Sequence, residues 1–246
     1  MPDGPAIAVF DIPIDDVSLD QAVDRLEAGV TQGGGPQVVY FANAHTLELA
    51  RRDPSYAAVL RRADTIYGDG VGVRLAVWWL HGVALQDNVN GTDLVPRWLA
   101  ASSGHRVFLL GAEKDRVRKA ADHVRTTFPH WQVVGAHHGF FTEERETMVL
   151  EAIDSAQPDV LLVGMGNPRQ ERFIDRHRDR LSVPLNLGVG ALFDYWSGAQ
   201  RRAPRVLRER GLEWGWRMVF HRGKLGRYTT GSARFLWGVA RSRQAG

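Results

Sequence analysis

The sequence predicts an α/β protein: a mainly parallel sheet with helices on both faces, followed by a helical C-terminal appendage. Short runs rich in β-branched residues alternate with longer segments of helical periodicity over most of the 246 residues. Such alternation is typical of βαβ crossovers, which set strands in parallel and cover both faces of the sheet. After Gly198 the strand signals cease, and the rest of the chain has the pattern of helix alone.

Seven segments carry the strand signal. Each is a short apolar run of the kind that is buried in a parallel sheet. In chain order they are Ala6–Phe10, Gln37–Phe41, Thr65–Tyr67, Arg106–Leu110, Gln132–Ala136, Val160–Val163 and Val183–Leu187.

Seven longer segments predict helices. Their apolar residues recur three and four positions apart, which places them along one side of a helix. The segments lie near 18–30, 45–62, 70–80, 91–103, 114–128, 143–155 and 168–180.

A boundary near residue 197 predicts two parts, an α/β domain over 1–197 and an appendage over 198–246. Residues 195–246 contain 12 Lys or Arg against only Glu209 and Glu213, although the net charge of the chain is only +3. Basic residues interleaved with tryptophan suit an anionic membrane surface, and they also suit nucleic acid. Half of the eight tryptophans lie in this stretch: Trp196, Trp214, Trp216 and Trp237.

The composition excludes several classes of protein. The chain has no cysteine, so disulfides, thiol nucleophiles and cysteine metal sites are excluded. The first residues, MPDGPAIAVFDIPIDD, lack the pattern of a signal peptide, and no run reaches the roughly 20 apolar residues of a membrane span. We therefore expect a cytoplasmic protein.

Glycines and polar side chains follow five predicted strands, at the end where an open parallel sheet binds its ligands. Glycines leave backbone N–H groups unobstructed, and several stand before helices whose N-termini favour phosphate. We therefore expect a phosphorylated ligand there. The expected substrate-binding residues are Asn43, Gly70, Gly72, Gly111, Gly164, Gly166, Gly188, Gly190 and Asp194.

Several of these motifs have two interpretations. Gly164 and Gly166 begin a dinucleotide fingerprint, but Arg169 replaces its third glycine, so an NAD-type oxidoreductase is only an alternative. Asn43 and Asp194 either cap helices or bind sugar hydroxyls. His137-His138 would be a metal pair, yet neighbours on an extended chain point to opposite faces, so we expect a surface turn and no metal.

Asp69 stands between Gly68 and Gly70, just before a predicted helix. The glycines would let a substrate approach closely, and a carboxylate there could take a proton from an attacking hydroxyl. It could equally be a polar residue of a tight glycine turn. The residues alone leave both interpretations open.

Taken together and in order, the motifs resemble those of the WecG/TagA/CpsF glycosyltransferases. The matching stretches include DGVG, NGTDL, GNPRQE, GVGALFD, RRAP and LEWGWR, and the resemblance runs from about residue 8 to 228. It implies a Rossmann-like core with a membrane-contacting C-terminal appendage.

The resemblance also implies a reaction. These enzymes use a UDP-sugar to extend a polyprenyl-diphosphate-linked sugar at the cytoplasmic membrane face, inverting the anomeric centre without a metal. The donor would carry N-acetylmannosamine, its uronic acid or glucose, for cell-surface or exopolysaccharide biosynthesis, with no cofactor. The missing Asp-x-Asp motif agrees with metal-free chemistry. The alternative from another class is a nucleic-acid-binding protein, which we do not expect; a homo-oligomer is left open.

Particular residues receive roles from this resemblance. The general base falls on Asp69, and Gln170 is the candidate for holding polar groups of donor or acceptor. Asn43 matches a strand-end asparagine, and Asp194 is expected near the nucleoside. The basic appendage positions that would neutralise the leaving UDP are Arg217, Lys224 and Arg227.

The sequence departs from the family pattern at three places. Phe41 stands where some members have threonine, so a hydroxyl role there is lost. His45 replaces Glu of some members, and His221-Arg222 replaces a usual Glu-Pro, which puts the acceptor group and the docking of the appendage in doubt. Beyond these places, Phe235, Leu236 and Trp237 are expected to face lipid.

Overall fold

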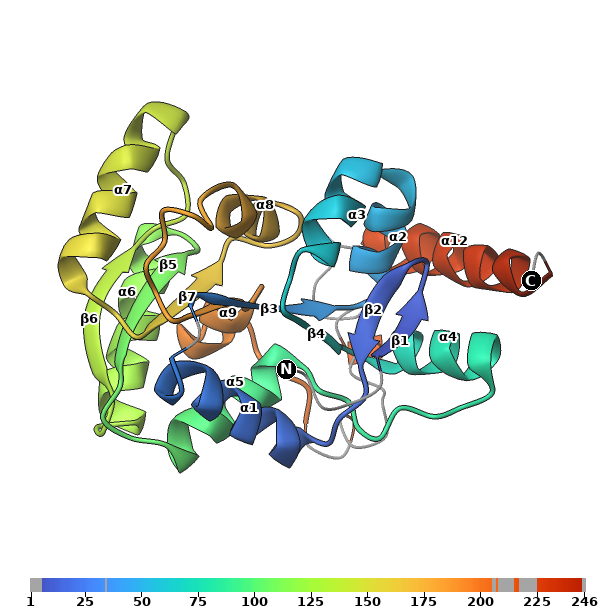
Figure 1. The fold of residues 1–246 in the computed structure, drawn as a ribbon, viewed down its shortest axis with the longest axis horizontal. Helices are drawn as coiled ribbons and strands as arrows, with labels where there is room; N and C mark the ends of the chain where they lie inside the picture. Colours follow the sequence, from blue (N-terminus) through green and yellow to red (C-terminus); the bar gives the residue numbers. More distant parts are fainter. Residues whose placement is uncertain (1–5, 34, 205–206, 208–214, 217–224, 245–246) are drawn as a thin grey trace.

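Eight strands of the described chain form one mainly parallel sheet, in the order β1-β2-β4-β3-β8-β7-β5-β6 (Figure 1). The computed structural model describes residues 6–33, 35–204, 207, 215–216 and 225–244. Among the strands of the described residues, only β1 and β2 pair antiparallel. The strands are β1 (Ala6–Val9), β2 (Ile12–Asp15), β3 (Gln37–Ala42), β4 (Thr65–Gly68), β5 (Arg106–Gly111), β6 (Gln132–His137), β7 (Val160–Gly164) and β8 (Leu185–Gly188).

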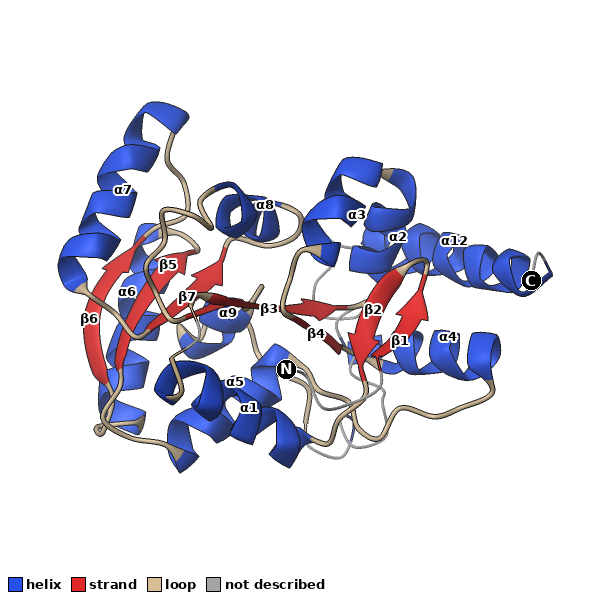
Figure 2. Ribbon diagram, in the orientation of Figure 1, coloured by secondary structure: helices blue, strands red, loops and turns tan. Residues whose placement is uncertain are grey.

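Helices cover both faces of the sheet, which confirms the predicted α/β class. Figure 2 shows α3 and α8 on one side of the sheet and α1 and α5 on the other. The first face carries α2 (Ala44–Arg52), α3 (Pro54–Arg61), α4 (Val71–His81), α7 (Glu143–Ala156), α8 (Arg169–Arg176) and α12 (Leu225–Gln244). The second face carries α1 (Leu19–Thr31), α5 (Gly91–Ala101), α6 (Lys114–Thr127) and α9 (Leu192–Trp196).

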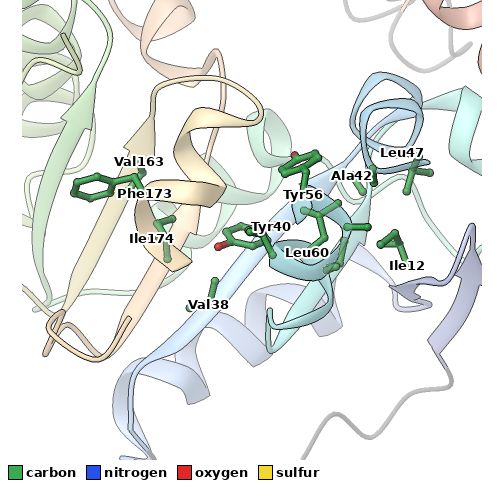
Figure 3. Close-up of a cluster of buried hydrophobic side chains, with 14 of the residues drawn as sticks. Ile12, Val38, Tyr40, Ala42, Leu47, Tyr56, Leu60, Val163, Phe173 and Ile174 are labelled. Carbon is green, nitrogen blue, oxygen red and sulfur yellow. The ribbon is translucent and has the colours of Figure 1, made fainter. Parts of the chain in front are cut away.

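On the first face of the sheet, a hydrophobic core lies between β3 and the helices that cover this face (Figure 3). Tyr40 of β3, Tyr56 of α3 and Phe173 of α8 are buried there. The Tyr40 hydroxyl donates to the backbone carbonyl of Glu171 over 3.1 Å, so its polar end is satisfied within the core. This contact fixes α8 against the central strands.

Strand β2 is absent from the sequence prediction. It pairs with β1 through a two-residue turn at Phe10 and Asp11, which have φ of 52° and 62°. Hairpin turns with positive φ ordinarily carry Asn or Gly, and Phe-Asp gives no such signal. The prediction of one strand over Ala6–Phe10 therefore missed its partner.

The helix expected over 45–62 is two helices. Asp53 ends α2 and caps α3, because its carboxylate accepts from the N–H groups of Ser55 and Tyr56. Pro54 occupies the first turn of α3, where its missing N–H costs nothing.

The C-terminal helix α12 packs along α2 and α4, at the right of Figure 1. Phe235 is only 1% exposed and meets Phe10 edge-to-face at 5.8 Å. The expectation that Phe235 faces lipid is therefore wrong, although Leu236 and Trp237 are exposed as expected. None of the described helices is both long and apolar enough to cross a bilayer.

Candidate active site

The carboxyl ends of the parallel strands bring the predicted glycines, Asn43 and Asp69 to one edge of the sheet. The chain leaves β5 for α6 on one face and β7 for α8 on the other, so the connections diverge between these neighbouring strands. Open α/β sheets bind ligands in the crevice at such a point. The residues at or just after these strand ends include Asn43, Asp69, Gly111, Gly164 and Gly188.

Four of the predicted glycines permit close packing beneath the loops. A Cβ at Gly111 would collide with the carbonyl oxygen of Gly164, and one at Gly164 would lie 2.7 Å from the ring of Phe193. At Gly188 it would lie 3.0 Å from the Gln170 amide, and at Gly72 it would lie 3.0 Å from the Cβ of Ala44. These positions therefore shape the floor of the site.

The other three glycines, at positions 70, 166 and 190, have positive φ and open space around the missing Cβ. Their N–H groups are already engaged within the protein. Gly70 donates to the Asn88 side chain over 2.6 Å, while Gly166 and Gly190 donate to Gln170 at 3.1 and 3.0 Å. These glycines thus supply room beside the loops rather than free donors.

Asp69 follows β4 directly, and its backbone N–H bonds to the carbonyl of Ala42 over 2.8 Å. Its side chain is partly exposed. The N-cap of α4 is Gly70, which has no side chain to close the first turn. Asp69 therefore immediately precedes the N-terminus of α4, where the helix dipole has its positive end.

Asn43 caps α2, which confirms the structural interpretation of this residue. Its Oδ1 accepts from the N–H groups of His45 and Thr46 and from the Thr46 hydroxyl, at 3.0 to 3.2 Å. Within the described residues its Nδ2 group makes no hydrogen bond, so a donor is left for a ligand.

A neighbouring cluster was missed among the predicted site residues. Asn88 holds the loop at Gly70, and Asn90 caps α5 by accepting from the N–H of Asp93 at 3.0 Å. Arg202 pairs with Asp93 at 2.7 Å, so the segment after α9 docks beside the Asp69 loop. Asp93 belongs to the NGTDL motif and Arg202 to the RRAP motif, but nothing in the sequence alone shows that these two distant motifs are in contact.

Gln170 is buried and joins two loops of the site. Its side-chain oxygen accepts hydrogen bonds from the N–H groups of Gly166 and Gly190, while its Nε2 donates to Glu171 Oε1 over 2.8 Å. Asn167 donates to the same oxygen at 2.9 Å and to the Thr46 hydroxyl at 3.1 Å. A hydrogen-bonded network therefore runs from the cap of α2 to the loop after β8.

Glu171 is fully buried at the centre of this network. Burial raises the pKa of its carboxyl to about 7, although the hydrogen bond from Gln170 opposes the shift. Its Oε2 has no hydrogen-bond partner within the described residues. A buried carboxyl of this kind favours the neutral form up to about neutral pH.

Asp194 does not cap a helix, because it lies inside α9, whose N-cap is Ala191. Its carboxylate bonds to Arg116 of α6 at 2.9 Å and to Gln200 at 2.7 Å. This pairing raises the pKa of the Arg116 guanidinium. Each carboxylate oxygen keeps a lone pair that can accept a further hydrogen bond.

A cavity of about 520 Å³ opens beside the ends of β6 and β7, lined by Phe140, Phe141, Thr142, Arg145 and Arg169. The Arg169 guanidinium stands 5.6 Å from the centre of the exposed Phe140 ring. An aromatic face and two cations are suited to a base and a phosphate respectively.

The two histidines before this cavity lie at the end of β6, whose last residue is His137, and not in a surface turn as expected. Their rings stack at 4.5 Å, so the expected opposite orientation is wrong. His137 Nδ1 bonds to the carbonyl of His138, and the N–H of Phe140 donates to His138 Nδ1. No three potential metal ligands come together among the described residues.

The appendage residues predicted to reach the donor lie largely outside the described chain. Arg217 and Lys224 fall outside the described residues, together with His221 and Arg222. Arg227 belongs to α12, but its side chain is not described.

An open α/β sheet whose connections diverge between neighbouring strands, with a cavity beside the strand ends, is typical of proteins that bind a ligand at that edge of the sheet. Residues 7–246 match the model of the Glycosyl transferase WecG/TagA/CpsF family. The chain belongs to this family and is a glycosyltransferase.

Three relatives carry one name, N-acetylglucosaminyldiphosphoundecaprenol N-acetyl-β-D-mannosaminyltransferase. The chain is similar to the Bacillus spizizenii enzyme, with 33% identity over 83% of this chain and 79% of the relative. It is 28% identical to the Bacillus subtilis enzyme, over 87% and 83% of the two chains. It is 27% identical to the Staphylococcus aureus enzyme, over 97% and 93%.

Proposed function

We propose that this enzyme transfers N-acetylmannosamine from its UDP-linked form to N-acetylglucosamine on a polyprenyl diphosphate, with inversion and without a metal. The names of the three relatives support this acceptor and this transferred sugar. The reaction belongs to cell-surface polysaccharide biosynthesis at the inner face of the membrane. The observation that carries the proposal is the position of Asp69 at the open N-terminus of α4.

The chemical step is a single in-line displacement. The acceptor hydroxyl oxygen bonds to the anomeric carbon, the bond from that carbon to UDP breaks, and Asp69 takes the hydroxyl proton. UDP leaves with its negative charge. One displacement inverts an α-linked donor, which agrees with the β configuration in the names of the relatives.

The UDP half of the donor is assigned to the crevice between β5 and β7. There Phe140 offers a face for the base, while Arg145 and Arg169 offer positive charge to the diphosphate. Strands β4 and β7 are three places apart in the sheet, or about 14 Å at the usual strand spacing. The transferred sugar would lie across this span, with Asn43 between the two ends.

The appendage completes the site in this proposal. Arg217, Lys224 and Arg227 would neutralise the leaving diphosphate in place of a metal. Asp194 would accept a ribose hydroxyl while its bond to Arg116 persists.

Asp69→Asn tests the proposed base. Transfer from UDP-N-acetylmannosamine to a short polyprenyl-diphosphate N-acetylglucosamine should fall by roughly 10²- to 10⁴-fold. UDP affinity, measured by calorimetry, should stay within about twofold, because the base faces the acceptor. The control is Asp20→Asn, an exposed carboxylate on α1. Wild-type turnover in a folded Asp69→Asn variant would refute the role of this residue.

A further inference from the structure

Helix α4 is apolar on two opposite sides. Val73, Ala76 and Val77 are buried against the sheet. Four other apolar residues are exposed, and their spacing of four, seven and eight positions places them in one outward stripe. This outward stripe consists of Val71, Leu75, Trp78 and Trp79, of which Trp78 is 56% exposed.

An exposed apolar stripe of this kind indicates a surface that binds a partner or a membrane. A helix that is apolar all round is ordinarily buried in a core or a membrane, and large exposed apolar patches mark interaction sites. Apart from His81, the only basic side chain of α4 is Arg74, and the helix contains no acidic residue.

The adjacent helix α12 has the same character. It lies beside α4 (Figure 1), with the ring of Phe235 3.9 Å from a Cβ placed at Gly72. Leu236 and Trp237 are exposed, Trp237 by 59%, and the Arg241 guanidinium stands 5.3 Å from the Trp237 ring. The sequence of α12 contains no Asp or Glu.

We propose that the outward stripe of α4 docks the catalytic domain of this enzyme on an anionic lipid bilayer, beside the lipid contact already expected of Leu236 and Trp237 of α12. Tryptophan is stable at the depth of lipid headgroups, and the arginines on both helices meet anionic phosphates there. A second copy of the chain fits less well, because a two-fold interface over this surface would set the same arginines against one another.

This inference rests on the proposed lipid-linked acceptor and adds a second membrane contact, on the catalytic domain itself. Helix α4 begins two residues after Asp69, and Trp78 follows Asp69 by nine residues, which is about 13 Å along a helix. Docking through α4 therefore holds the proposed base near the membrane surface, where the diphosphate of the acceptor lies.

Vesicle binding by the full-length chain tests the docking surface without reference to activity. With vesicles containing about 30% phosphatidylglycerol, Leu75→Glu/Trp78→Glu should lower the bound fraction at least tenfold in a flotation assay. Leu236→Glu/Trp237→Glu should lower it as well. The matched control is Met148→Glu on α7, at the opposite end of the molecule (Figure 1), where the side chain is 66% exposed. Leu75→Gln/Trp78→Gln serves if the charged pair alters the circular dichroism spectrum.

The outcomes separate this inference from the proposed function. Undiminished vesicle binding by the folded α4 variants overturns the docking surface, whatever their turnover. Loss of self-association in these variants, measured by sedimentation, with no vesicle binding by the wild type, assigns the surface to a second copy instead. Retained vesicle binding by a wild-type protein that transfers no sugar leaves the docking surface standing and refutes the proposed reaction.

Discussion

The side-chain amide of Gln170 donates to Glu171 Oε1 over 2.8 Å, and its own oxygen holds the loops after β7 and β8. Two consecutive residues of α8 thus join a buried carboxyl to both sides of the proposed donor site. The carboxyl also has the Tyr40 and Tyr56 hydroxyls around it, and burial raises the pKa of both phenols. Glu171 is therefore the member of this network whose charge changes near neutral pH.

Glu171→Gln should flatten the dependence of stability on pH. The raised pKa keeps Glu171 protonated in the folded protein up to about pH 7, whereas the unfolded chain ionises above about 4.5. The contribution of Glu171 to the free energy of unfolding is thus complete below pH 4.5 and is lost as the pH rises through 7. The free energy of unfolding changes by about 3 kcal/mol over this range. Urea unfolding of wild type and variant at pH 5 and pH 8 measures it. Glu151→Gln, an exposed change on α7, is the control, and equal pH slopes for wild type and Glu171→Gln would contradict the prediction.

Gln170→Ala should leave the N–H groups of Gly166 and Gly190 without their acceptor. We expect a loss of about 1–3 kcal/mol in the free energy of unfolding, together with weaker UDP binding, because both loops border the donor site. Denaturant unfolding and calorimetric UDP titration measure the two effects. Gln132→Ala, exposed on β6, should change neither by more than the error of measurement. Normal UDP affinity in Gln170→Ala would show that the loops hold their positions without this amide.

Phe235→Ala should destabilise the protein by about 3–5 kcal/mol, because the ring is buried between α4 and the turn at Phe10. Leu236→Ala, its exposed neighbour, should cost under about 0.5 kcal/mol. Thermal and chemical unfolding compare the pair. A similar small effect of both changes would mean that α12 contributes little to the stability of the core.

Transfer should survive dialysis against EDTA. The sequence has no Asp-x-Asp motif, and the basic side chains Arg145 and Arg169 line the cavity assigned to the UDP half. Turnover before and after chelation, with and without added Mn²⁺ or Mg²⁺, measures the requirement. Lost activity that a divalent ion restores would overturn the metal-free reaction.

Local patterns predicted most elements but not all of their boundaries. The strand and helix periods at β3, α6 and β7 match the structure within one residue. The errors arose where a turn lacked its usual residues, as at Phe10 and Asp11, or where a capping signal was overlooked, as at Asp53. Both are effects of a few residues within a longer periodic pattern.

The sequence by itself determined the α/β class, the glycine-rich strand ends, the basic composition of the C-terminal segment and the resemblance to one family, because each depends on neighbouring residues or on ordered motifs. Only the tertiary structure decided what these residues touch. It placed the N–H of Gly190 on Gln170, docked Arg202 on Asp93, buried Phe235 and exposed Trp78. Periodicity states that a helix has an apolar side, but which apolar residues are covered depends on packing between segments far apart in the chain.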